Sequence, residues 1–259
     1  MKILILQDQA AGTRRAAEMI CDSVMRRPDG VLGLATGGTM EPLYAELVSR
    51  HREGRLSFAR SKSFNLDEYV GLAPSHPQSY HSYMDQHLFG QVDFAPGATA
   101  LPDGSAPDPH AEADAYEARI VAAGGIDLQL LGIGRNGHIG FNEPTSSLCS
   151  RTRVKTLTES TRAANARFFG PGEEPPTYAI TMGLASILDA REVLLLAFGK
   201  EKAPAVRAAI EGPMSAFTPA SVLQMHRHAT LILDQAAASD LELREYYFTV
   251  HPDGAPAVV

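Results

Sequence analysis

A glycine-rich segment near the middle of the chain holds a histidine and, five residues later, a glutamate. It reads Gly132-Ile133-Gly134-Arg135-Asn136-Gly137-His138-Ile139-Gly140-Phe141-Asn142-Glu143-Pro144. Carboxylates orient imidazoles and stabilise their charged form, so His138 and Glu143 are a candidate proton-transfer pair. No metal is expected, because only one histidine lies here and no ligand spacing is present. The structural alternative, a histidine that satisfies loop backbone, is disfavoured by so specialised a glycine pattern.

A second candidate for proton transfer follows a short apolar run at residues 63–66, where the sequence continues Asp67-Glu68-Tyr69. A carboxylate at the carboxyl end of a strand can act as a general base in the crevice above a sheet. For either carboxylate taken alone, capping of the following turn is the commoner role.

Two strand-to-helix turns have the composition of an anion site. Thr36-Gly37-Gly38-Thr39 follows an apolar run, and Gly199-Lys200-Glu201-Lys202 follows another, with Pro204 suited to a first helical turn. Glycines admit a ligand to the backbone, and helix N-termini attract anions. A tight turn and a solvated lysine pair are the plain alternatives. Neither turn has the dinucleotide-binding or P-loop pattern, and two such turns in one domain favour a phosphate site.

These residues need a scaffold that brings strand ends together. Apolar, strand-like runs alternate with segments of helical spacing, which predicts a three-layer, doubly wound, Rossmann-like α/β domain with a mainly parallel sheet. We expect one domain over residues 1–259. The predicted strands are 2–6, 31–35, 63–66, 126–131, 192–198 and 230–233, and the predicted helices include 13–25, 41–50, 111–123 and 202–210.

Composition excludes several classes of protein. The 23 Lys and Arg residues are outnumbered by 30 Asp and Glu, a formal net charge of −7, so we expect no nucleic-acid partner. The longest apolar run, 193–198, is far too short to span a membrane, and the first ten residues lack the pattern of a signal peptide. Only two cysteines occur, without ligand-like neighbours. A cytoplasmic protein with reduced thiols is expected.

Several longer motifs together resemble the glucosamine-6-phosphate deaminase family. The similarity runs in order from about residue 30 to 235. The motifs are TGGT (36–39), FNLDEYVGL (64–72), SYHSYM (79–84), GHIGFNEP (137–144), SRTRVKTLT (150–158) and ANARFF (164–169).

The resemblance implies conversion of glucosamine 6-phosphate and water to fructose 6-phosphate and ammonia, with no cofactor and no metal. It implies that Asp67 moves a proton between C2 and C1, and that His138, supported by Glu143, assists ring opening. Asn136 departs from the family pattern, which often has Asp there, so the amide cannot supply charge to the histidine. The residues implied to surround the substrate phosphate are Thr36, Gly37, Gly38, Thr39, Arg167 and Lys202.

Two other functions compete with deamination. A 6-phosphogluconolactonase shares the fold and a similar glycine–histidine loop, but it needs no base to move a C2 proton, so Asp67 favours the deaminase. A non-catalytic sugar-phosphate sensor usually carries a further DNA-binding or partner domain, for which we expect no room in this chain. The presence of Asp67, His138 and Glu143 together in this chain also favours catalysis over a sensor role.

A second polar and basic group follows the histidine loop. In the resemblance, its positions match those that bind N-acetylglucosamine 6-phosphate between subunits of hexameric, allosterically activated members. A homo-oligomer, with a hexamer as one form, is therefore expected. A charged strand on a solvated face is the alternative. The group comprises Ser146, Arg153, Lys155 and Thr156, and Tyr247 is a weaker candidate to close it.

Overall fold

A seven-stranded sheet forms the centre of the protein. The computed structural model describes residues 1–166, 169 and 173–254. The strand order is β1-β10-β9-β6-β2-β3-β5, and every neighbouring pair is parallel. The strands are β1 (Lys2–Leu6), β2 (Val31–Leu34), β3 (Lys62–Asn65), β5 (Thr99–Ala100), β6 (Leu128–Gly132), β9 (Glu192–Ala197) and β10 (Ala229–Asp234).

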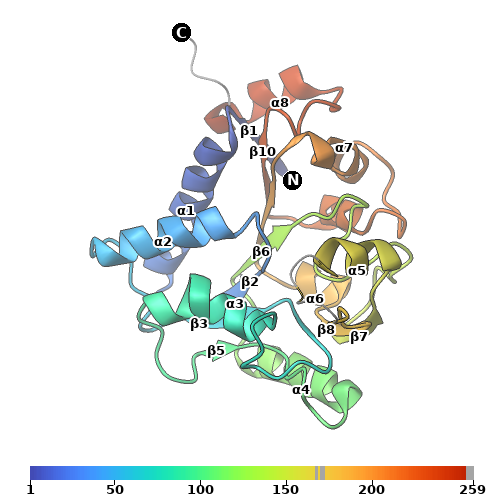
Figure 1. The fold of residues 1–259 in the computed structure, drawn as a ribbon. Coiled ribbons are helices and arrows are strands. Elements are labelled where there is room, and N and C mark those ends of the chain that lie inside the picture. Colours follow the sequence, from blue (N-terminus) through green and yellow to red (C-terminus); the bar gives the residue numbers. More distant parts are fainter. Residues whose placement is uncertain (167–168, 170–172, 255–259) are drawn as a thin grey trace.

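Helices cover both faces of this sheet, with α1 and α2 on one side and α6 and α7 on the other (Figure 1). The predicted mainly parallel α/β sheet is therefore confirmed. No helix in the described ranges is long and apolar enough to cross a membrane. The α-helices are α1 (Gln9–Arg26), α2 (Glu41–Arg52), α3 (Tyr80–His87), α4 (Pro109–Ala122), α5 (Glu159–Ala166), α6 (Leu184–Leu188), α7 (Ala203–Ile210) and α8 (Arg244–Val250). The 3-10 helices are η1 (Phe89–Gln91), η2 (Lys200–Lys202), η3 (Pro219–Met225) and η4 (Pro252–Gly254).

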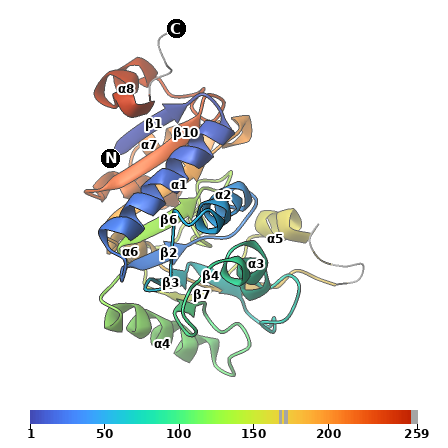
Figure 2. The same ribbon diagram turned by 90° about the vertical axis from the view of Figure 1, so that its left-hand side faces the viewer.

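A second, three-stranded antiparallel sheet lies beside the first and was not predicted. Its order is β4-β8-β7, made of β4 (Asp67–Tyr69), β8 (Tyr178–Thr181) and β7 (Arg153–Thr156). The α4 helix lies close to it in Figure 2. Its strands are three or four residues long, too short for alternation to reveal them.

Capping residues explain where the predicted and observed helix starts differ. The α1 helix begins before the predicted residue 13 because the Asp8 side chain accepts a hydrogen bond from Ala11 N at 2.8 Å. The α4 helix begins at Pro109 because Asp108 accepts from the amides of the first turn. In both cases a capping aspartate fixes a start that apolar periodicity alone places too late.

The connections from the two central strands run in opposite directions. From β2 the chain continues outward to β3 and β5, whereas from its neighbour β6 it continues to β9 and β10. The boundary between β2 and β6 is thus a topological switch point, and ligands of doubly wound sheets bind beyond the carboxyl ends of strands at such a point.

Candidate active site

The candidate residues follow the carboxyl ends of four neighbouring strands, β3, β2, β6 and β9. Asp67 follows β3, Thr36 follows β2, His138 follows β6 and Lys202 follows β9. Since the strands are parallel, these residues come to the same edge of the sheet, on both sides of the switch point. The predicted catalytic and anion-binding groups therefore share one region.

Asp67 begins the short strand β4 and is 6% exposed. Burial raises the pKa of its carboxyl group to about 8, and the neighbouring Glu68 carboxylate adds to the rise. The Phe141 N–H and the Thr181 hydroxyl oppose the shift without overcoming it. A carboxyl group with this pKa exchanges a proton readily near neutral pH.

The histidine loop approaches Asp67 at Gly140, where a side chain would be both strained and crowded. The φ angle of Gly140 is +54°, a left-handed conformation that favours glycine. An added Cβ would lie 3.4 Å from Asp67 Oδ2 and 3.1 Å from Thr181 Oγ1. The absence of a side chain thus lets the loop that carries His138 pack against the candidate base.

Glu143 is 1% exposed and lies among hydrogen-bond donors. Its carboxylate accepts from Asn136 Nδ2 at 2.8 Å, from Thr158 Oγ1 at 3.2 Å and from the Thr161 hydroxyl. His138 Nδ1 lies 3.5 Å from Glu143 Oε2. Burial alone would raise the pKa of Glu143, but these donors and His138 lower it to about 2. Glu143 therefore presents a fixed negative charge to the imidazole.

Asn136 affects the His138 imidazole mainly through the Glu143 carboxylate. Its amide nitrogen donates to Glu143, whereas its Oδ1 accepts from the backbone N–H of His138 at 3.3 Å. The amide oxygen thus contacts the main chain of the histidine loop, and the amide nitrogen contacts the carboxylate that faces the imidazole. The two threonines that hold Glu143 were not singled out as site residues, because nothing in their local sequence marks them.

The turn at residues 36–39 has the shape of an anion-binding loop. Gly37 has a φ of +102°, and Met40 N donates to Gly37 O at 2.8 Å, which closes the turn. The α2 helix that follows has no side-chain cap at its N-terminus. Thr36, Gly37, Gly38 and Thr39 thus lead directly into a helix end that attracts anions.

Lys202 lies on the other side of the switch point, immediately before α7, which also begins without a side-chain cap. Its Nζ donates to Ile133 O at 2.9 Å, which ties it to the histidine loop. Burial lowers the pKa of Lys202, and the Arg135 guanidinium lowers it further, although Glu201 opposes this. Arg135 is thus a second cation at this position, which sequence reasoning missed. Arg167, the remaining predicted phosphate residue, lies outside the described residues.

Three residues of the second polar group lie on β7 of the small antiparallel sheet, and Ser146 lies in the loop that follows Glu143. Arg153 and Lys155 project from the same face of β7, and Thr156 projects from the other. Arg153 Nη1 donates to Asn142 Oδ1 at 2.8 Å, and its guanidinium lowers the pKa of Lys155 in addition to the effect of burial. Ser146 N donates to Glu143 O at 3.0 Å, and the buried Ser146 hydroxyl has no hydrogen-bond partner among the residues that the structure describes.

Tyr247 is not brought to this group within one chain. It lies in α8, at the opposite end of the molecule from β7 in both views (Figures 1 and 2). Its hydroxyl donates to Glu211 Oε1 at 3.1 Å. Tyr247 therefore anchors the C-terminal helix to the end of α7 in the isolated chain.

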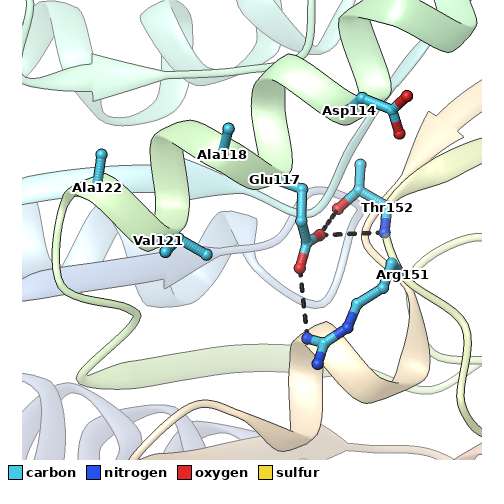
Figure 3. A pocket seen from close by; sticks show the side chains of 7 residues that line it. All are labelled: Asp114, Glu117, Ala118, Val121, Ala122, Arg151 and Thr152. Carbon is cyan, nitrogen blue, oxygen red and sulfur yellow. Dashed lines mark hydrogen bonds and ion pairs between the residues drawn. The ribbon is translucent and has the colours of Figure 1, made fainter.

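A cavity of about 510 Å³ lies between α4 and the segment that leads into β7 (Figure 3). Glu117 projects into it and accepts hydrogen bonds from Thr152 N at 3.1 Å and from the Thr152 hydroxyl. No predicted site residue lines this cavity, so it plays no part in the candidate site. No group of three or more potential metal-ligating side chains occurs in the part of the chain that the structure describes.

Comparison with known proteins identifies the family. Residues 7–232 match the family model described as glucosamine-6-phosphate isomerases/6-phosphogluconolactonase. The chain belongs to this family. The glucosamine-6-phosphate deaminase of Shewanella loihica is 57% identical over 247 residues, which are 95% of this chain and 92% of that protein. The Mycolicibacterium smegmatis enzyme of the same name is 52% identical over 248 residues, 95% of each chain.

Solved structures of a glucosamine-6-phosphate deaminase and of a 6-phosphogluconolactonase are both similar to this chain. A structure described as a monomeric glucosamine-6-phosphate deaminase has a TM-score of 0.90 and 46% identity, and covers 93% of this chain and 100% of its own. The 6-phosphogluconolactonase from Trypanosoma cruzi has a TM-score of 0.76 and 21% identity, with 93% and 97% covered. The second similarity shows only a shared fold.

Proposed function

We propose that this protein converts glucosamine 6-phosphate and water to fructose 6-phosphate and ammonia. The observation that carries the proposal is the position of Asp67, a buried carboxyl group with a pKa of about 8, at the same sheet edge as the Thr36–Thr39 turn and Lys202. Isomerisation of an aldose to a ketose requires a base that removes a proton from one carbon and returns it to the next. A group with this pKa is suited to both steps near neutral pH.

The residues divide into three roles. Asp67 takes the proton from C2 and delivers it to C1 of the open-chain sugar. His138 transfers the proton that accompanies ring opening, while Glu143 holds the imidazole and stabilises its charged form. The Thr36–Thr39 turn, Lys202 and Arg167 bind the phosphate, which anchors the sugar and positions its reacting carbons.

Lactone hydrolysis is the competing function in the family, and two observations count against it. The deaminases compared above are more than half identical to this chain, whereas the solved lactonase has 21% identity. Hydrolysis of a lactone also leaves no task for a base that moves a proton between carbons. The test is an ammonia-release assay with glucosamine 6-phosphate beside hydrolysis of 6-phosphogluconolactone, with one enzyme preparation. Lactone hydrolysis without ammonia release would reverse the assignment.

The phosphate assignment predicts a specific effect of Lys202→Ala. The phosphate is remote from the reacting carbons, so its contact persists through the reaction and its loss raises KM while changing kcat little. A charge-assisted contact of about 1.5–3 kcal/mol corresponds to an increase in KM of about 10–150-fold. Initial rates against substrate concentration measure this. Lys200→Ala is the matched control, since Lys200 pairs with Asp240 on the surface. Equal effects of the two substitutions would contradict the assignment.

We also propose that Ser146, Arg153, Lys155 and Thr156 bind an anionic activator of the N-acetylglucosamine 6-phosphate type in a homo-oligomer. Two nearby cations and a buried hydroxyl without a partner support this. Arg153 touches Asn142, next to Glu143, so an occupant of the group reaches the histidine loop through one side chain. Tyr247 is included only if a neighbouring subunit supplies it.

The activator proposal predicts that the acetylated sugar phosphate increases substrate affinity by about 1–3 kcal/mol of coupling energy, or about 5–150-fold. Initial rates with and without the activator measure the effect, and light scattering gives the mass of the particle. The similar solved structure is described as monomeric, so a monomer with a hyperbolic rate curve that the activator leaves unchanged is the opposing outcome. That outcome would leave Arg153 and Lys155 with a structural role.

A further inference from the structure

Next to Asp67 lies a second carboxylate, Glu68, whose surroundings go beyond what a helix cap requires. We infer that Glu68 is a positioning residue for the base: it fixes the first turn of α3 to the strand that carries Asp67, and it places a negative charge beside Asp67. The inference rests on the proposed function only in taking Asp67 as the base.

The Glu68 carboxylate is 1% exposed, and both of its oxygens accept hydrogen bonds from nitrogen donors. Oε1 accepts from Tyr69 N at 2.8 Å and from Tyr80 N at 2.9 Å. Oε2 accepts from His81 N at 3.0 Å and lies 2.9 Å from His81 Nδ1. Each of these four nitrogens is an N–H donor or can act as one, so the surroundings of the Glu68 carboxylate suit a negative charge.

Helix capping does not account for this arrangement. The α3 helix already has an N-cap residue, Ser79, whose hydroxyl accepts from Ser82 N at 3.1 Å. Glu68 is a further tie from outside the helix, and it joins α3 to β4. A buried carboxylate is costly to desolvate, so its use where a cap is present indicates a requirement besides helix formation.

The helix that Glu68 anchors touches both loops of the candidate site. Tyr83 donates its hydroxyl to Gly37 O at 2.9 Å, in the anion-binding turn. The Tyr80 ring stacks on Phe141 of the histidine loop, with centroids 6.0 Å apart and planes at 13°. A displaced α3 would therefore disturb the phosphate turn and the histidine loop together.

The charge of Glu68 also distinguishes it from the other ionisable groups around Asp67. These are Tyr69 of β4, Tyr80 of α3 and Tyr116 of α4. Burial raises the pKa of Tyr69 to about 12, and it also raises the pKa values of Tyr80 and Tyr116 well above their ordinary value. All three are neutral in the working pH range, so among the residues that the structure describes Glu68 is the charged group that raises the pKa of Asp67.

His81 contacts the Glu68 carboxylate and should weaken the effect of its charge on the pKa of Asp67. Its ring is partly exposed, and Asp103 lies close enough for the imidazole to lower the pKa of that carboxyl group. A donor or positive charge on His81 offsets the charge of Glu68. Removal of Glu68's charge and removal of His81 should therefore change the proton affinity of Asp67 in opposite directions.

The experiment compares Glu68→Gln and His81→Phe by the pH titration of Asp67. Carbon NMR of the Asp67 carboxyl group, assigned with Asp67→Asn, follows the titration directly, and the acidic limb of kcat/KM follows it in catalysis. We expect the midpoint to move down by about one pH unit in Glu68→Gln and upward in His81→Phe. Asp108→Asn is the control, because Asp108 caps α4 away from the site and its removal should not move the midpoint.

A midpoint that stays in place in folded Glu68→Gln overturns the inference, as do shifts of the same sign in both variants. If Glu68→Gln does not fold, His81→Phe decides: an upward shift supports the inference and no shift overturns it. If the parent protein releases no ammonia, the proposed function fails, but the carbon NMR titration still tests the effect of Glu68 on Asp67.

Discussion

Asp67 and Glu143 are both buried carboxyl groups at the same sheet edge, yet their pKa values move in opposite directions. Burial and the charge of Glu68 raise the pKa of Asp67 to about 8, whereas hydrogen-bond donors and His138 lower that of Glu143 to about 2 despite burial. Burial raises the pKa of both groups, and the donors and charges that face each carboxylate therefore decide whether that effect prevails. One environment produces a group that exchanges protons, and the other a permanent charge.

The largest expected effect comes from replacing the proton-exchanging member of the pair. Asp67→Asn keeps the shape of the side chain but removes its basicity, so kcat for ammonia release should fall by about 10²–10⁴-fold. Substrate affinity should change little, because the phosphate contacts lie elsewhere. Steady-state rates measure both quantities. Near-normal turnover would show that Asp67 is not the base. The difference in pKa between Asp67 and Glu143 would then have no consequence for catalysis.

The comparison also predicts opposite effects of the two carboxylates on stability. The folded-state pKa of Glu143 is depressed, so its contribution is present above its ordinary pKa and is lost as pH falls toward 2. The folded-state pKa of Asp67 is raised, so ionisation in the unfolded state costs stability as pH rises from about 4 to about 8. At neutral pH, Glu143→Gln should destabilise the protein and Asp67→Asn should stabilise it, each by about 1–3 kcal/mol.

Urea unfolding at about pH 4.5 and about pH 8 tests this pair of signs. The advantage of Asp67→Asn should be largest at the higher pH and should nearly vanish at the lower one. Glu117→Gln is a useful reference for Glu143→Gln, since it removes a carboxylate that also accepts several hydrogen bonds but lies outside the site. If Asp67→Asn and Glu143→Gln destabilise the protein equally, the donors do not control the two groups as described.

The same comparison separates what sequence can predict from what it cannot. Asp67 is recognisable because it directly follows an apolar run, and Glu143 because it follows His138 in a glycine-rich segment. The strand order then brings the two segments together. The donors that set their pKa values are not recognisable. Thr181 comes from β8 of the small antiparallel sheet, and Thr161 comes from α5. Both donors are separated in sequence from the carboxyl groups that they face, and the four-residue strand β8 is too short to show a period.

The smallest predicted effect concerns Asn136, which is the exposed donor to the Glu143 carboxylate. Its amide nitrogen donates to Glu143 Oε2 at 2.8 Å. In Asn136→Asp that donor is replaced by an oxygen, and a second negative charge stands beside Glu143. The pKa of Glu143 should rise, because like charges disfavour ionisation, and the added charge should favour imidazolium at His138.

Asn136 is exposed, so solvent screens the new charge and the limb of the pH profile that reports His138 should move upward by only about 0.5–1 unit. The maximal rate should change less, because Asp67 is untouched. Kinetics of kcat/KM against pH for the parent, Asn136→Asp and Asn136→Ala separate charge from lost hydrogen bonding, since only the aspartate adds charge. Coincident shifts in both variants would assign the effect to the missing donor. Superimposable profiles for all three proteins would mean that Glu143 shields His138 completely, and that the fixed charge in this environment is insensitive to its outermost donor.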